Sequence, residues 1–170
     1  IPLMIGYRCG LRIGEVYALT WDNVDLDNQT ITISKQIQWK QRPRTEEEKQ
    51  RSNGSKYVDA GFWYFSAPKF DSVRTIDIDR QLTDLLRREK NRQEKAEAYF
   101  ADRFKRYYEN PNKQIIETTL DNEVRFVCRR ENGEYIKPQG KAGDRYFNKK
   151  NIETYEKLKP ICQKYGLSEM

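Results

Sequence analysis

Residues 10–36 read GLRIGEVYALTWDNVDLDNQTITISKQ, and this stretch carries most of the information about the fold. Before and within its first half, apolar residues are interrupted by glycines, which predicts two short helical pieces that meet near Cys9 and Gly10. Residues 26–29 (LDNQ) predict a turn. From 30 to 39, isoleucine and tryptophan alternate with polar residues, and this period of two indicates a β-strand. Short helices followed by a strand predict an α+β fold.

Two later segments are expected to pair with the strand at 30–39. The aromatic run at 62–65 and the alternating segment Val73–Ile78 complete a predicted three-stranded antiparallel sheet. Residues 40–60 contain almost no apolar side chains, so they predict a mobile insertion at one tip of this sheet.

A long helix is expected to follow the sheet. Asp79 is a suitable N-cap, and the apolar pattern predicts a helix from about Arg80 to Glu109, ended by Pro111. Residues 87–95 are charged all round, which predicts that this part of the helix projects into solvent or onto a partner.

The last third of the chain predicts a hairpin and one more helix. The hairpin joins 124–128 to 135–136 through a turn at 131–133, and the helix covers about 151–165. The expected fold class is therefore α+β, mainly α, with a small three-stranded antiparallel sheet.

Composition narrows the class of function. The chain has 170 residues and a net charge of +6, which suits a polyanionic partner but is also compatible with an ordinary mixed surface. It contains no histidine, which excludes histidine-based triads and histidine-ligated metals. The three cysteines are far apart and predict free thiols in a reducing compartment, and no apolar run approaches the length of a membrane span. We therefore expect a cytoplasmic protein.

Two local patterns could carry chemistry. Arg12 and Glu15 are three residues apart and share a face if both are helical, so the carboxylate could direct the guanidinium toward two phosphate oxygens. Lys69 is expected at the tip of a two-stranded turn, where it could enter a nucleic-acid groove. From chemistry alone, a surface ion pair and a solvated lysine are the more frequent explanations of these two patterns.

The order of three segments changes this assessment. Residues 10–36 (quoted above), residues 63–79 (WYFSAPKFDSVRTIDID) and residues 126–138 (FVCRRENGEYIKP) together resemble the tyrosine recombinase family. The resemblance is strongest to integrases of phages and conjugative transposons and covers nearly the whole chain, with 40–60 and 87–120 the least similar parts. It implies a helical catalytic domain with a small sheet, which closes on double-stranded DNA as half of a clamp and assembles as a homotetramer on DNA. It also implies DNA strand exchange through a 3′-phosphotyrosyl intermediate, with no cofactor, neither metal nor nucleotide, and no small-molecule substrate.

The resemblance assigns roles to three residues. Arg12 matches the first active-site arginine, which binds the non-bridging phosphate oxygens, and Glu15 matches the acidic residue that supports it. Lys69 matches the hairpin lysine, which contacts DNA and protonates the leaving 5′-oxygen. Cys9 stands where threonine is common in the family, and Phe70 stands where a small polar residue is usual.

The chain also lacks parts that the family requires. The His-x-x-Arg box, a later histidine or tryptophan and the nucleophilic tyrosine are expected downstream of Met170, and the amino-terminal DNA-binding domains are absent. Residues 1–170 are therefore expected to be a partial catalytic domain that is inactive alone. Two other classes of function stay open at this point: a non-catalytic DNA-binding module, and a charged helical domain that binds another protein.

Overall fold

Glycine geometry separates the two helices that open the chain. The computed structural model describes residues 1–43, 45–51, 61–118 and 123–138. Helices α1 (Pro2–Cys9) and α2 (Ile13–Ala18) are joined through Gly10, whose φ of 62° lies in the left-handed region where a side chain would be strained. The prediction of two helical pieces that meet at this glycine is confirmed.

A three-stranded antiparallel sheet follows, in the order β1 (Val24–Asp25), β2 (Thr30–Ile33) and β5 (Arg74–Asp77). Asp25 accepts hydrogen bonds from two backbone amides of the turn at 26–29, which returns the chain from β1 to β2. The predicted alternation is present in β2, whose Ile31 and Ile33 are buried. The fold is α+β, as predicted.

The membership of the predicted sheet was wrong. Residues 30–39 form two strands, because β2 has both edges occupied by β1 and β5 and the chain takes a new partner after Ser34. Strand β3 (Gln36–Gln41) pairs with β4 (Gly61–Ser66) in a separate two-stranded ribbon, so β4 never joins the three-stranded sheet. The missing third strand is β1, whose two residues are too few to show a period in the sequence.

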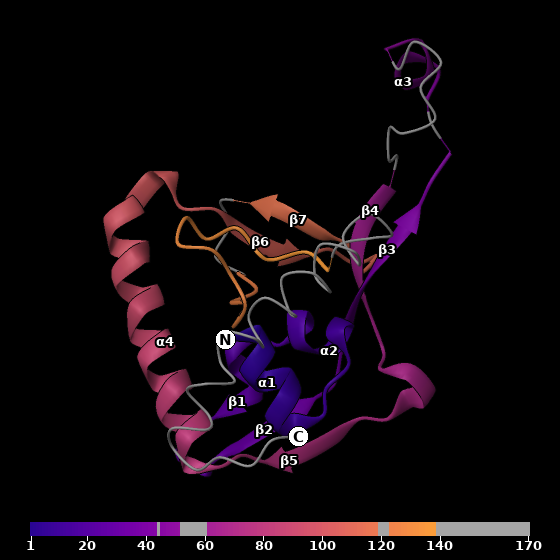
Figure 1. The fold of residues 1–170 in the computed structure, drawn as a ribbon. Helices are drawn as coiled ribbons and strands as arrows, with labels where there is room; N and C mark the ends of the chain where they lie inside the picture. Colours follow the sequence, from indigo (N-terminus) through magenta and orange to yellow (C-terminus); the bar gives the residue numbers. More distant parts are fainter. Residues whose placement is uncertain (44, 52–60, 119–122, 139–170) are drawn as a thin grey trace, which may run out of the picture. The chain divides into compact units, whose positions relative to one another are not determined.

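The ribbon formed by β3 and β4 leads to the short helix α3 (Glu46–Arg51), as Figure 1 shows. Arg42 donates two hydrogen bonds to the carboxylate of Glu48, at 2.9 and 2.7 Å, and fixes the beginning of this segment. Part of the predicted insertion at 40–60 is therefore strand and helix. Its mobility stays a prediction.

The long helix is shorter than predicted. Helix α4 (Arg80–Phe100) begins at the expected cap, where the Asp79 carboxylate accepts from the Leu82 amide at 2.9 Å. It ends at Ala101, whose φ of 46° breaks the helical path into a 3₁₀ turn (Ala101–Arg103). Strands β6 (Arg106–Glu109) and β7 (Ile115–Thr118) then pair antiparallel, and Pro111 lies in the turn between them rather than at a helix end.

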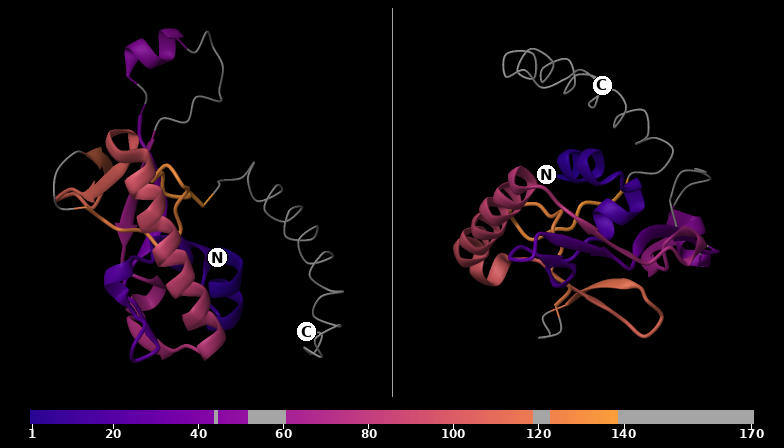
Figure 2. Two further views of the ribbon diagram at one scale, coloured as in Figure 1. Left: turned by 90° about the vertical axis from the view of Figure 1, so that its left-hand side faces the viewer. Right: turned by 90° about the horizontal axis from the view of Figure 1, so that it is seen from below.

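One face of α4 packs against the rest of the described fold, next to α1 (Figures 1 and 2). The prediction that residues 87–95 project into solvent or onto a partner was wrong for one face of the helix, because Glu89 and Gln93 are buried there together with Leu82 and Leu86. Most of the other residues of this stretch are exposed. The sequence pattern failed here because polar side chains can be buried when they are hydrogen-bonded, and such residues interrupt the apolar pattern that marks a buried helix face.

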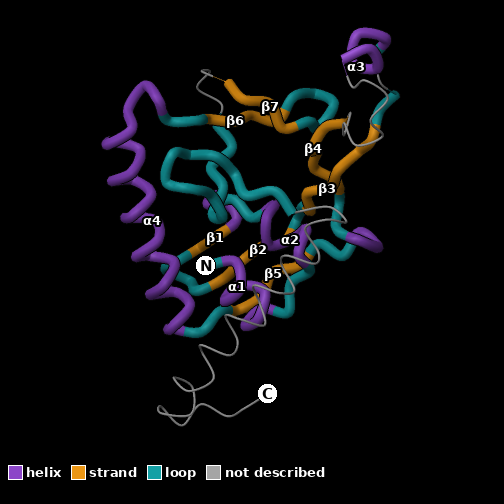
Figure 3. Tube along the Cα trace, turned by 45° about the horizontal axis from the view of Figure 1, so that its top comes forward, coloured by secondary structure: helices purple, strands orange, loops and turns teal. Residues whose placement is uncertain are grey.

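The segment 123–137, orange in Figure 1, lies between β6 and residues 19–21, and the three strands β1, β2 and β5 lie side by side in Figure 3. The Trp21 amide donates to the Arg125 carbonyl at 2.9 Å, and the Val127 amide donates to the Leu19 carbonyl at 2.9 Å. The predicted hairpin turn at 131–133 is present, but its arms are joined only by the bridge between Arg129 and Tyr135 and a few neighbouring hydrogen bonds. The helix predicted at 151–165 lies outside the described residues. The largest side chains without appreciable exposure are Phe65, Phe126, Ile5, Ile31, Leu82 and Leu86.

Candidate active site

Arg12 occupies the residue that precedes helix α2. Its φ of −66° and ψ of 151° are extended, so the prediction that Arg12 and Glu15 share a face within one helix was wrong in this detail. Glu15 is instead the third residue of the helix, where its carboxylate accepts a 2.9 Å hydrogen bond from the backbone amide of Arg12. The spacing of three therefore brings the two residues together through a helix cap.

Glu15 is the buried centre of this cluster. Its side chain has no exposed surface, while the Arg12 side chain is 51% exposed and approaches the carboxylate through Nη1 at 3.3 Å. Among the described residues, this 3.3 Å contact is the one hydrogen bond of the Arg12 guanidinium, and about half of the side chain is exposed. A guanidinium in this position can donate two hydrogen bonds to an oxyanion.

Arg74 is the second guanidinium on Glu15, and the sequence reasoning did not identify it. Its Nη2 lies 2.9 Å from Oε2 of Glu15 and its Nη1 lies 3.3 Å from Oε1, which is a two-point contact. A signal was present in the sequence, because Arg74 shares the inward face of β5 with Ile76 and the buried Ile78. A charge on the apolar face of a strand indicates a buried partner.

These contacts decide the charge state of Glu15. Burial opposes ionisation, but the hydrogen bonds from the Arg74 side chain and the Arg12 amide outweigh it and hold the pKa of Glu15 below its ordinary value of 4.5. Glu15 is therefore an anion at neutral pH, flanked by two cations. The cluster of Arg12, Glu15 and Arg74 carries one net positive charge.

Lys69 lies in a different setting from the predicted two-stranded tip. It begins a 3₁₀ turn (Lys69–Asp71) that connects β4 to β5, two strands that belong to different sheets. Lys69 is exposed, its Nζ lies 4.9 Å from the ring centroid of Phe70, and Phe70 is 83% exposed at a φ of 64°. Among the described residues no hydrogen bond or ion pair joins Lys69 to Arg12 or Glu15.

The Lys69 turn is nevertheless braced on the Arg12 cluster. Arg74 Nη1 donates to the Ser72 carbonyl at 3.1 Å, and Gln36 Nε2 donates to the Ala67 carbonyl at 2.7 Å. Helix α2 approaches this region closely, since a Cβ on Gly14 would lie 3.1 Å from the Ile37 carbonyl oxygen. The structure thus brings Arg12 and Glu15 into contact and holds the turn of Lys69 from two sides.

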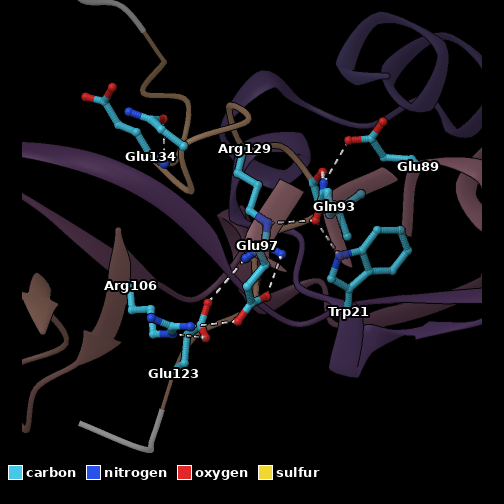
Figure 4. Close-up of polar contacts among 10 residues, drawn as sticks. Trp21, Glu89, Gln93, Glu97, Arg106, Glu123, Arg129 and Glu134 are labelled. Atoms are coloured by element: carbon cyan, nitrogen blue, oxygen red, sulfur yellow. Dashed lines mark hydrogen bonds and ion pairs between the residues drawn. The ribbon is translucent and has the colours of Figure 1, made fainter. Parts of the chain in front are cut away.

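A second polar cluster holds α4 to the segment 123–137 (Figure 4). The side-chain oxygen of Gln93 accepts from Trp21 Nε1 at 2.9 Å and from Arg129 Nε at 2.8 Å, and the Gln93 amide nitrogen donates to the Val127 carbonyl at 2.8 Å. Arg129 Nη1 also lies 3.3 Å from Oε1 of Glu123. Burial, reinforced by the nearby carboxylate of Glu97, raises the pKa of Glu123. The described members of this cluster contact one another, so we assign the cluster a structural role: it holds α4 against the segment 123–137.

A groove of about 510 Å³ lies elsewhere, along β4 and the turn between β6 and β7. Neither Arg12, Glu15, Lys69 nor Arg74 lines it. No group of three or more metal-binding side chains occurs among the residues that the structure describes, and Cys9 and Cys128 are free thiols. In the same part of the chain, no helix combines the length and apolar character needed to cross a membrane.

No protein-family model matches the chain, and no curated protein matches it. Solved structures of the Tn1549 transposon integrase superpose on it. The integrase in complex with transposon right-end DNA is 23% identical, with a TM-score of 0.49, and the match covers 88% of this chain and 37% of that one. A complex with circular intermediate DNA gives 21% identity, a TM-score of 0.44 and the same coverage, and another gives 17%, 0.44 and coverages of 98% and 37%. The chain therefore spans little more than a third of these solved chains, and the likeness concerns the fold alone.

Proposed function

We propose that this chain is part of the catalytic domain of a tyrosine recombinase and that Arg12 binds the non-bridging oxygens of the scissile DNA phosphate. The observation that carries the proposal is the fully buried Glu15 carboxylate, which contacts the half-exposed Arg12 through one Nη nitrogen, the only hydrogen bond or ion pair of the Arg12 side chain among the described residues. An ordinary surface ion pair would have both partners in solvent. Burying a carboxylate is costly unless cations and hydrogen bonds compensate it, and the half-exposed Arg12 is one of the groups that compensate Glu15.

In the proposed reaction, a tyrosine outside this chain loses its phenolic proton to solvent and attacks the scissile phosphorus, and the P–O5′ bond breaks as the 3′-phosphotyrosyl bond forms. Arg12 stabilises the charge that develops on the non-bridging oxygens, and Glu15 keeps Arg12 in place. The leaving 5′-oxygen takes a proton from Lys69, because an alkoxide is a poor leaving group. A 5′-hydroxyl of another strand then gives its proton back to Lys69 and attacks the phosphotyrosine, and the released tyrosine regains its proton from solvent. The reaction therefore consumes no high-energy cofactor.

Lys69 and Arg12 can be tested in one experiment, in a protein that carries this chain together with the downstream box and tyrosine. The substrates are normal DNA and DNA with a 5′-bridging phosphorothiolate, whose thiolate leaves without protonation. We expect Lys69→Ala to cleave normal DNA very poorly and to regain most of its cleavage on the sulfur substrate. Arg12→Lys should lose on the order of 10³-fold or more on both substrates, as arginines on transferring phosphoryl groups do.

DNA binding by both variants, measured in parallel, separates chemistry from affinity. We expect both to bind DNA within a few fold of the unmodified protein, since one contact among many phosphate contacts is lost. Equal impairment of Lys69→Ala on the two substrates would remove the role of general acid. Cleavage by Arg12→Lys at the unmodified rate would overturn the proposed phosphate site.

A further inference from the structure

Arg74 neutralises Glu15 more completely than Arg12 does. Its two terminal nitrogens contact the two carboxylate oxygens at 2.9 and 3.3 Å, whereas the side chain of Arg12 makes one contact at 3.3 Å. The Arg74 side chain is 32% exposed and that of Arg12 is 51% exposed, so the inner partner is Arg74. A two-point arginine–carboxylate contact also fixes the plane of both groups.

The two-point contact of Arg74 with Glu15 determines whether the Arg12 guanidinium is free to bind an anion. If Glu15 had Arg12 as its sole counterion, the buried carboxylate would draw the guanidinium inward and occupy its paired donors. With Arg74 in place, Glu15 needs only the backbone amide and one Nη of Arg12 to complete its hydrogen bonds. The charge of Arg12 then has no full partner in the cluster and is available to an anion.

Arg74 is itself fixed by the backbone around it. It pairs with Ile33 in the ladder between β2 and β5, and its Nη1 also donates to the Ser72 carbonyl at 3.1 Å. Ser72 directly follows the turn that carries Lys69. One side chain therefore contacts both the support of Arg12 and the end of the Lys69 turn.

We infer that Arg74 is a positioning residue: it holds the buried Glu15 so that Arg12 presents a free guanidinium to a phosphate anion. The inference rests on the proposed function, in which Arg12 binds the scissile phosphate. Arg74 itself does not touch the phosphate, because both of its terminal nitrogens are engaged with Glu15.

The test uses this chain labelled with ¹⁵N-arginine and titrated with inorganic phosphate, and in parallel with dimethyl phosphate as a model of a phosphodiester. The Arg12 Nε–H signal is assigned by its loss in Arg12→Lys, and its movement reports binding at Arg12. We expect Arg74→Met to weaken this binding by about tenfold, the size of effect that follows when one charged hydrogen-bonded contact is lost. Arg87→Met, which removes an exposed arginine paired with Leu26 and Asp27, is the matched control and should leave the affinity unchanged.

Arg74→Lys separates positioning from simple charge balance. This variant has a positive charge beside Glu15 but lacks the two-point contact. We therefore expect it to be as stable as the unmodified chain and to bind phosphate as weakly as Arg74→Met does. Full recovery of affinity in Arg74→Lys, unchanged affinity in Arg74→Met, or movement of the Arg74 Nε–H signal on adding phosphate would each overturn the inference. If the Arg12 signal of the unmodified chain does not move with either phosphate, the proposed function itself is wrong. That result can be distinguished from the three outcomes that overturn only the role of Arg74. Should Arg74→Met not fold, the comparison of Arg74→Lys with Arg87→Met still decides.

Discussion

At the scale of single residues, Glu15 links stability to the presentation of Arg12. A carboxylate with no exposed surface is tolerated only because two arginines and a backbone amide satisfy it. The same contacts that make the anion stable also fix the direction of Arg12. Stability and candidate function therefore depend on the same hydrogen bonds at this site.

A pH dependence follows from Glu15. Its pKa lies below the ordinary 4.5, so its stabilising effect is present above that pH and is lost as the pH falls through the folded-state pKa. We expect Glu15→Gln to lower the free energy of unfolding at pH 7 by about 2–4 kcal/mol, since it leaves two guanidiniums without their anion. Urea denaturation of both proteins at several pH values measures the difference, which should shrink as the pH falls through the lowered pKa of Glu15 and the carboxylate protonates. A difference that is constant with pH would show that the charge of Glu15 is unimportant.

The candidate site was predictable from the sequence where the signal was local. Arg12 and Glu15 are three residues apart, and the helix cap that joins them needs no distant part of the chain. Arg74 is 59 positions from Glu15, and only the pairing of β2 with β5 brings it to the cluster. That pairing could not be derived from composition or spacing, although the inward position of Arg74 on its strand was visible.

At the scale of elements, the errors have a common origin. Phe104 and Tyr107 continue the apolar spacing of α4, but they are buried from a loop and from β6, so the same residues fit two different periods. The break at Ala101 has no marker such as glycine or proline, because an alanine adopts the positive φ. The start of α4 was predicted correctly, since its cap is a local contact of Asp79.

Helix α4 gives an element-scale prediction. Gln93 connects the helix to Trp21, Val127 and Arg129 through its single amide group. We expect Gln93→Ala to lower the free energy of unfolding by about 2–4 kcal/mol, because it leaves buried donors and a buried arginine partly unsatisfied. Glu94→Ala, one position along on the exposed side, should change stability by less than about 0.5 kcal/mol. Chemical denaturation of the two variants checks this, and equal effects would mean that the cluster around Gln93 contributes nothing specific.

At the scale of the whole molecule, charged side chains are abundant, but many of them form ion pairs with each other. The sequence has a net charge of +6 from 32 basic and 26 acidic residues. Many of the described arginines, such as Arg74, Arg92 and Arg106, form ion pairs with glutamates. An arginine already neutralised in this way displaces few counterions from DNA, so the cations that remain free should dominate binding to a duplex.

The final prediction concerns how this chain binds duplex DNA. Backbone contacts should dominate, so affinity should be weak, indifferent to sequence and steeply salt-dependent, with a log–log slope of about −0.9 for each phosphate neutralised. Fluorescence anisotropy across a salt series measures the slope for the unmodified chain and for two variants that each remove one charge. Lys69→Gln removes an exposed lysine with no ion pair among the described residues, and it should reduce the slope by about one. Arg87→Gln removes an arginine that is already paired with Asp27, and it should change the slope less. If both variants change the slope equally, binding follows net charge rather than the position of Lys69, and the expectation that Lys69 contacts DNA is wrong.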